Sequence, residues 1–296
     1  MILVCGATGQ LGGAVAARLL DRGAHVRVLL RPSADAAPLA QRGAEIARGD
    51  FRDPRSLHDA VADTDTVVTS VTAIGRALAG ENISLDAVDR KGTLALTDAA
   101  EQAGVERLVY VSAAGMENAA RFPLSRAKLA VERRLRASSL REVIVKPDAF
   151  QEVWISPLAR LDWQQGRLEV LGRGETKTAY VSVGDVAEAI VRLTLADDPP
   201  REVTFGGPER LTRNEVCDLI EQAAGRQLER RHVPRAILHV TSRALGPVKP
   251  ALASLLGLGL MMDTHESSWD DVPLRTLGID PRPASIYVRA AVAASG

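Results

Sequence analysis

The sequence predicts an α/β fold built on a doubly wound parallel sheet, and three features near the start of the chain predict it. A short apolar run at residues 1–5 ends at a glycine-rich turn, as expected for a buried strand. Apolar side chains then recur at helical spacing as far as Gly23, and glycine commonly closes a helix. A second apolar run follows at residues 25–31. Strand, turn, helix and strand in this order begin a doubly wound sheet.

The turn after the first strand has glycines at the spacing of a dinucleotide-binding loop. Gly6 lets the chain turn out of the strand, Gly9 leaves space for a pyrophosphate, and Gly12 lets the helix pack closely on the sheet. The helix N-terminus also favours an anion. The loop therefore predicts a dinucleotide site, with an ordinary glycine turn as the alternative. The residues expected at the dinucleotide here are Gly6, Thr8, Gly9, Gln10, Leu11 and Gly12.

The end of the second strand indicates which dinucleotide binds. An acidic residue there would bind the ribose 2′-hydroxyl of NAD, whereas an arginine suits the 2′-phosphate of NADP. This chain has Arg31 and no acidic residue before Asp35. Because a guanidinium can grip a phosphate with several donors, we predict NADP(H) in preference to NAD(H). The alternative for Arg31 is a solvated loop arginine.

Further strands alternate with helices through the first half of the chain. They are expected at residues 44–48, 65–71, 108–112 and 143–147, and a long helix with apolar side chains from Val88 to Ala103 is expected before the strand at residues 108–112. A doubly wound sheet binds its ligand at the carboxyl ends of its strands. The sequence therefore predicts that Val71 and Thr72 border the cofactor.

Two stretches resemble a known family. Residues 4–13, Val-Cys-Gly-Ala-Thr-Gly-Gln-Leu-Gly-Gly, look like the opening of the NmrA-like group of atypical, extended-type short-chain dehydrogenases/reductases. Residues 99–112 are similar to the corresponding stretch of the extended enzymes. The group includes proteins similar to isoflavone reductases, NADPH-dependent quinone reductases and redox-inactive NADP sensors. The resemblance implies a Rossmann fold with further cofactor contacts at Asp50 and Phe51, although Asp50 could instead serve a turn or a helix cap.

Lys128 lies on a helix expected at about residues 124–137. The family's YxxxK motif places a tyrosine one helical turn before the lysine, where it acts as general acid or base. This chain has Leu124 there, so the chemistry that depends on that tyrosine is in doubt. The resemblance implies that Lys128 holds the nicotinamide ribose or acts as acid or base, with a solvated lysine as the alternative. Ser112 could bond a substrate carbonyl or cap its turn, and Ser125 is a weaker substitute.

After the core, the chain is expected to build a smaller, non-contiguous substrate-binding part, beginning near residues 147–155. The predicted core is residues 1–150 with a return at 179–206, and the predicted substrate-binding part is residues 151–178 and 207–296. Candidate pocket residues are Ala113, Phe150 and Trp154, and plain core packing is the alternative for the aromatic pair.

Capping residues set the expected helix boundaries in this later part. Asp185 is predicted to cap the helix that follows it. Thr212 and Glu215 have the spacing of a capping box. Two short apolar helices are expected at residues 235–244 and 248–256.

Composition restricts the classes of partner. The 296 residues include 37 basic and 37 acidic side chains, so the net charge is zero. This argues against nucleic acid or a membrane as a general partner, and leaves a local patch open. The two cysteines, Cys5 and Cys217, are expected as buried thiols in a cytoplasmic protein. We recognise no signal peptide, membrane span or metal-ligand spacing.

Together these observations predict an NADPH-dependent reductase of an apolar conjugated carbonyl or quinone-type small molecule. The missing tyrosine equally suits a redox-inactive NADP(H)-sensing protein. A non-redox cyclase, isomerase or dehydratase on the same fold is a further alternative. We expect a monomer or homodimer whose partner is a small apolar metabolite.

Overall fold

The computed structural model describes residues 1–294, which fold into two compact units. Unit 1 comprises Met1–Ser112, Arg126–Lys146 and Val186–Val203, and unit 2 comprises Ala113–Ser125, Pro147–Asp185 and the described residues from Thr204 onward. Residues 113–125 were predicted with the core, whereas their contacts group them with unit 2.

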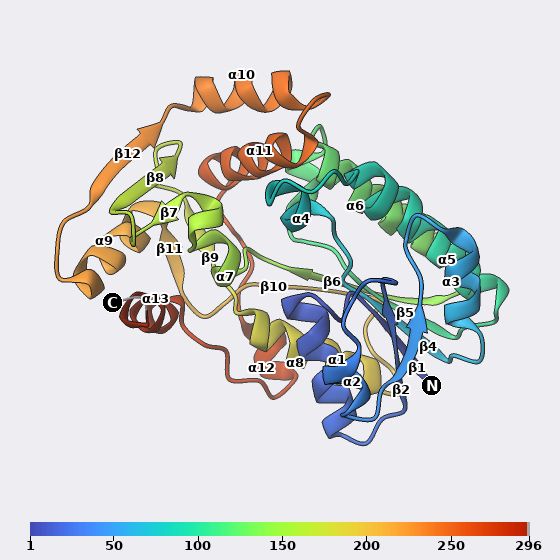
Figure 1. Cartoon of the computed structure of the whole chain (residues 1–296). Helices are drawn as coiled ribbons and strands as arrows, with labels where there is room; N and C mark the ends of the chain where they lie inside the picture. The colour runs from blue at the N-terminus through green and yellow to red at the C-terminus, as the bar shows by residue number, and fades with distance from the viewer. Residues whose placement is uncertain (295–296) are drawn as a thin grey trace. The chain divides into compact units, whose positions relative to one another are not determined.

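Unit 1 is built on a seven-stranded sheet with the order β10-β6-β5-β4-β1-β2-β3 (Figure 1). The neighbouring pairs from β6 to β3 are all parallel. The strand order reverses between β1 and β4, which makes this the switch point where a doubly wound sheet binds its ligand. The predicted doubly wound fold is therefore confirmed. The strands are β1 (Ile2–Cys5), β2 (Val26–Leu30), β3 (Glu45–Arg48), β4 (Thr66–Thr69), β5 (Arg107–Val111), β6 (Arg141–Pro147) and β10 (Glu202–Phe205).

Helices cover both faces of this sheet. Figure 1 shows α3 (Pro54–Val61), α5 (Thr93–Gln102) and α6 (Pro123–Arg136) on one face. The other face carries α1 (Gln10–Asp21) and α8 (Val183–Leu195). Two short helices, α2 (Ala37–Ala40) and α4 (Ile74–Leu78), lie in the connections.

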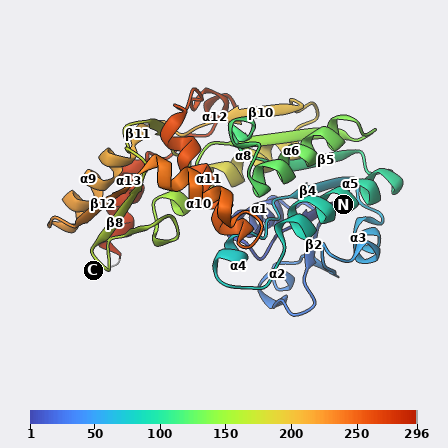
Figure 2. The ribbon, with the colours of Figure 1, turned by 90° about the horizontal axis from the view of Figure 1, so that it is seen from above.

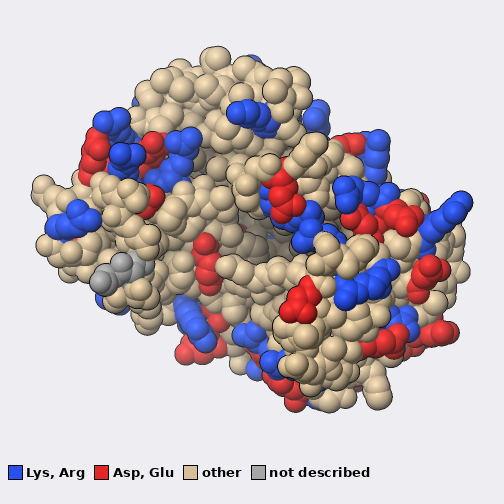
Figure 3. All heavy atoms as spheres, in the orientation of Figure 1, with Lys and Arg blue, Asp and Glu red and all other residues tan. Residues whose placement is uncertain are grey.

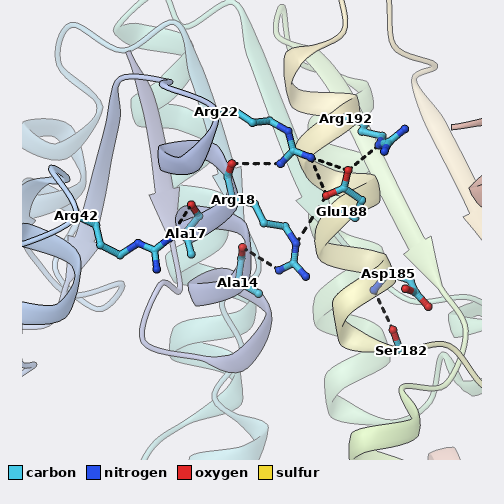
Figure 4. A network of polar contacts seen from close by, with 9 residues as sticks. All are labelled: Ala14, Ala17, Arg18, Arg22, Arg42, Ser182, Asp185, Glu188 and Arg192. Atoms are coloured by element: carbon cyan, nitrogen blue, oxygen red, sulfur yellow. Dashed lines mark hydrogen bonds and ion pairs between the residues drawn. The ribbon is translucent and has the colours of Figure 1, made fainter. Parts of the chain in front are cut away.

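An ion-pair cluster joins α1 to α8 (Figure 4). The Arg22 guanidinium donates to both carboxylate oxygens of Glu188, at 2.7 and 2.9 Å. Arg192 donates to the same carboxylate at 2.7 Å, and Arg18 lies 3.7 Å from it. Arg22 and Glu188 are 166 residues apart in the sequence, so these contacts connect the first helix of the chain to a much later one.

The helix that leads into β5 begins irregularly. A regular helix was expected, but Asp86–Gly92 forms a π-helical turn before α5. Gly92 packs against Phe51 so closely that an added Cβ would lie 2.8 Å from the Phe51 Cβ. The turn brings Asp89 into the interior, where it is 3% exposed. Such π-helical insertions frequently occur at functional sites.

Unit 2 contains two small sheets and most of the remaining helices. One sheet pairs β9 (Lys177–Ala179) with β11 (Arg210–Thr212), and the other has the order β12-β8-β7. An apolar cluster in unit 2 includes Ile155, Val170 and Ile220. The other strands and helices are η2 (Met116–Ala119), α7 (Gln151–Trp154), η3 (Pro157–Ala159), β7 (Leu161–Asp162), β8 (Arg167–Leu171), α9 (Arg213–Ala224), β12 (Glu229–Val233), α10 (Arg235–Leu245), α11 (Pro250–Thr264), α12 (Val272–Thr276) and α13 (Ala284–Ala293).

Of the two helix caps predicted from the sequence, the structure confirms one and contradicts the other. The capping box of Thr212 and Glu215 is confirmed at the start of α9. The prediction that Asp185 caps α8 is wrong, because α8 already begins at Val183. The Ser182 hydroxyl accepts the Asp185 N–H at 2.9 Å (Figure 4). The Asp185 carboxylate accepts the Arg282 N–H at 2.8 Å.

Candidate functional site

The glycine-rich loop joins β1 to α1 at the switch point of the sheet. Gly6 adopts φ +94°, a conformation that favours glycine, and its carbonyl accepts the Gly9 N–H at 2.9 Å. Gly9 precedes α1, and no side chain caps this helix. Thr8, Gly9 and Gln10 are exposed. The loop therefore presents an uncapped helix N-terminus, which suits a pyrophosphate.

Gly12 has the close packing that the sequence predicts. A Cβ on Gly12 would lie 2.6 Å from the Gly6 carbonyl carbon and 2.9 Å from the Ser70 Oγ. Only glycine fits between α1 and the ends of β1 and β4 without a shift of the backbone. The loop geometry thus fits the dinucleotide that the glycine spacing predicts.

Charged side chains gather after β2 and β3. Arg31, directly after β2, is partly exposed, and its carbonyl accepts a hydrogen bond from Arg48 at 2.9 Å. Asp50 follows β3 and receives two bonds from the Arg52 guanidinium, at 2.9 and 2.7 Å. This pairing lowers the pKa of Asp50 to about 2. Arg76 also lowers the Asp50 pKa, so a fourth arginine lies near these two strand ends, beside Arg31, Arg48 and Arg52.

The buried carboxyl group of Asp89 lies at the carboxyl end of β4. It accepts the Ala73 N–H at 3.0 Å and interacts with the Thr72 hydroxyl. Burial raises the pKa of Asp89, and these two donors partly oppose the rise. The carboxyl group therefore fixes the segment after β4, where Val71 and Thr72 were predicted to border the cofactor.

Lys128 lies on α6 beside the end of β5. Its Nζ donates to the Val111 carbonyl at 2.9 Å and lies 5.4 Å from the centre of the Tyr110 ring. Burial lowers the pKa of Lys128, while the negative charges of Asp89 and Glu132 act in the opposite direction. Lys128 is a partly exposed residue whose ammonium group is bonded to the strand and influenced by two carboxylates, so it is not a lysine solvated on the arginine-rich face of α6.

Ser112 is engaged inside unit 1. It is 3% exposed, and its hydroxyl donates to Glu132 Oε1 at 2.5 Å. Glu132 is 1% exposed and also forms ion pairs with Lys146 at 3.0 Å and Arg136 at 3.1 Å. The predicted contact between Ser112 and a substrate stays a prediction. Ser125 is fully buried in α6.

Two of these side chains were missed in the sequence. Asp89 escaped notice because residues 88–103 were assigned to a regular helix, and the charged residues directly after it, Arg90 and Lys91, gave no sign that it is buried. Glu132 lies four residues after Lys128, on the same side of the helix, but it stands in an arginine-rich stretch that suggested a solvated face.

The predicted pocket residues lie in unit 2. Ala113 and Trp154 are partly exposed, and Phe150 pairs with Val181 through an isolated parallel bridge. Trp154 lines a cavity of about 20 Å³, which holds about one water molecule. The other lining residues include Tyr180, Arg213, Met262 and Asp263. Arg213 is 9% exposed and donates to the carbonyls of Trp154 and Ala159.

Among residues 1–294, no group of three His, Cys, Asp or Glu side chains could hold a metal ion. No helix in the described part of the chain is long and apolar enough to cross a membrane.

Comparison with known families identifies the class of protein. The family model described as NAD(P)H-binding matches residues 6–197, which contain the glycine-rich loop, Asp89 and Lys128. The chain belongs to the NAD(P)H-binding family. This confirms the predicted family and the predicted class of cofactor, a nicotinamide dinucleotide.

Two sequence relatives of this NAD(P)H-binding protein and one solved structure of similar fold have different described roles. The photosystem II assembly factor Ycf39 of Guillardia theta is 29% identical over 238 residues, 80% of this chain and 74% of that protein. The NAD(P)H azoreductase of Xenophilus azovorans is 27% identical over 227 residues, 76% and 74% of the two chains. The NADPH-dependent quinone oxidoreductase QOR2 of Escherichia coli, solved with NADPH, has a TM-score of 0.77 at 19% identity, covering 98% of this chain and 99% of that chain. The last likeness concerns the fold alone.

Proposed function

We propose that this protein is an NADPH-dependent reductase whose acceptor is an apolar quinone or conjugated carbonyl compound. The main support for the proposal is the position of Lys128, which is partly buried beside the end of β5 and donates a hydrogen bond to the Val111 carbonyl. The residue one turn earlier is Leu124, which has no proton to donate. The azoreductase and the quinone oxidoreductase named above support the choice of acceptor.

The glycine-rich loop and Arg31 would hold the dinucleotide. The backbone N–H groups at the start of α1 would bind the pyrophosphate, and the Arg31 guanidinium would bind the 2′-phosphate. Bound NADPH supplies a hydride. We also propose that Asp50 and Phe51 contact the adenine of the dinucleotide.

In this proposal Lys128 holds the nicotinamide ribose and supplies a proton. Reduction of a quinone to its hydroquinone consumes two protons and two electrons, and the hydride accounts for one proton and both electrons. The second proton comes from the Lys128 ammonium group, which recovers it from water. Burial lowers the Lys128 pKa, which makes this group a better proton donor than a solvated lysine.

The roles of Ser112 and Asp89 in this scheme are indirect. The Ser112–Glu132 bond fixes the start of the segment after β5, and Asp89 fixes the segment after β4. The negative charges of Asp89 and Glu132 oppose the lowering of the Lys128 pKa by burial. Ala113, Phe150 and Trp154 complete the proposal as walls of the acceptor pocket.

NADPH oxidation with a panel of quinones and enones tests this function. We expect saturable decay of NADPH absorbance that Lys128→Ala abolishes. The matched control is Lys91→Ala, because Lys91 is 68% exposed and should not affect turnover. Full activity in Lys128→Ala would exclude Lys128 from the reaction.

A second candidate function is an NADP(H)-sensing protein that assists assembly of a complex. The Ycf39 relatives favour it, because their described role is assembly of photosystem II. Such a protein would bind NADPH and NADP⁺ with different affinities and oxidise NADPH with no acceptor in the panel. Calorimetric titration of both nucleotides, together with the oxidation assay, separates the two functions.

A further inference from the structure

The outer side of α10 in unit 2 exposes aliphatic side chains. Ile237 is 52% exposed and Val240 is 64% exposed, and Val248, just beyond the helix, is 77% exposed. Ala244 is also exposed and lies one turn from Val240. Ile237, Val240 and Ala244 have the i, i+3, i+7 spacing of one helix face. We call these four residues the outer face of α10.

The opposite side of α10 already has a partner. Leu238 and Ser242 are buried, and Leu238 packs in a cluster with Leu171, Leu256 and Leu260, against which Leu245 also lies. α10 lies alongside α11 in both views (Figures 1 and 2). A surface helix usually has one apolar face and one polar face. Because α10 is aliphatic on both sides, its outer face is built for a second contact.

The charged residues beside this face are basic. From Arg230 to Met262 the sequence contains five arginine or lysine residues and no aspartate or glutamate. Three of the five, Arg230, Arg231 and Arg235, form ion pairs with acidic residues outside that stretch. Arg243 and Lys249 are exposed next to the outer face. Figure 3 shows the surface at the top, where Figure 1 places α10, as mostly tan with blue atoms. Arg243 and Lys249 therefore form a small basic patch on a chain whose net charge is zero.

We infer that the outer face of α10 binds an anionic lipid surface, with the helix lying in the plane of the membrane. Binding of this kind requires exposed apolar area and neighbouring cations, and both are present. The exposed apolar residues are aliphatic, whereas the anchors of protein interfaces are typically aromatic. α10 has 11 residues, too few to cross a bilayer. This inference does not depend on the reductase proposal.

Sedimentation of the full chain with vesicles tests the inference. We expect binding to vesicles of phosphatidylcholine mixed with phosphatidylglycerol, much weaker binding to phosphatidylcholine alone, and a loss of binding at high salt. Val240→Glu should reduce the bound fraction at least about tenfold, because it places a charge in the apolar face. Val272→Glu is the matched control: Val272 on α12 is 59% exposed and should tolerate the same change without effect.

A second pair of variants tests the charges. Arg243→Glu combined with Lys249→Glu should abolish binding to the anionic vesicles, whereas Arg55→Glu, an exposed change on α3, should not. Unchanged Tm values for all variants establish that folding is intact. Equal binding of wild type and Val240→Glu, or equal binding to both kinds of vesicle, would overturn the inference. Binding to polyglutamate without binding to vesicles would assign the patch to an acidic protein and would also overturn it.

Discussion

The packing of Gly12 permits a test that separates the architecture of the loop from its ligand contacts. A Cβ on Gly12 would lie 2.6 Å from the Gly6 carbonyl carbon and 2.9 Å from the Ser70 Oγ, both closer than side chains normally approach. A Cβ on Gly9 would meet nothing nearer than the Gly6 oxygen at 3.3 Å. The backbone of Gly9, with φ −87° and ψ 163°, is also open to alanine. Gly12→Ala should therefore destabilise the fold, whereas Gly9→Ala should weaken only the binding of the dinucleotide.

The expected magnitudes follow from these contacts. Overpacking of this kind costs about 1–3 kcal/mol, so Gly12→Ala should be destabilised by that amount. In a domain of about 150–250 residues, each kcal/mol lowers the Tm by about 2–4 °C. Gly9→Ala should keep the Tm at or above that of the wild type, because alanine restricts the unfolded chain. Its methyl group should instead cost one charge-assisted hydrogen bond to phosphate, about 1.5–3 kcal/mol. That loss raises the Kd for NADPH about 10- to 100-fold.

Thermal unfolding and NADPH fluorescence titration of both variants provide the measurements. The control is Gly246→Ala in unit 2, where a Cβ would also lie 3.3 Å from its nearest neighbour, the Arg243 oxygen. This control should change neither Tm nor Kd. An unchanged Tm in Gly12→Ala would refute the packing argument. Wild-type affinity in Gly9→Ala would refute the placement of the pyrophosphate at this loop.

Three further predictions concern single side chains. Arg31→Ser should raise the Kd for NADPH about tenfold or more and leave that for NADH nearly unchanged, and equal losses for both would remove the 2′-phosphate role. Arg52→Ala should cost about 0.2–1 kcal/mol in urea unfolding at neutral pH. Because pairing lowers the Asp50 pKa to about 2, that difference should shrink as the pH falls from about 4 towards 2, whereas a constant difference would deny the ion pair. Burial raises the pKa of the Cys217 thiol to about 11, so thiol reagents near neutral pH should label it only after unfolding.

The architecture of unit 1 and the start of α9 in unit 2 could be predicted from the sequence because their signals are local. The apolar run before Gly6, the helical spacing after it and the capping box of Thr212 each depend on residues a few positions apart. Asp185 shows the limit of such reasoning. Aspartate is a common cap, but a hydroxyl three residues earlier, that of Ser182, was available and the helix starts sooner.

The surroundings of the candidate site depend on contacts between distant parts of the chain. The Ser112–Glu132 bond and the ion pair of Glu132 with Lys146 bring together two strands and a helix, and no spacing along the chain encodes them. The buried position of Asp89 depends on a π-helical turn, which has no simple sequence pattern. The position of Lys128 was predictable because the family resemblance placed it, but its bond to the Val111 carbonyl was not.

The fate of a deuterium label would show whether this protein catalyses the proposed hydride transfer from NADPH. NADPH deuterated on one face or the other of nicotinamide C4 would be oxidised with a quinone acceptor, and the mass of the resulting NADP⁺ measured. An asymmetric site presents only one face to the acceptor. If the protein transfers the hydride, we therefore expect one labelled form to yield NADP⁺ that retains deuterium and the other to yield unlabelled NADP⁺. Tight NADPH binding without oxidation, or a mixture of masses from both forms, would contradict the claim.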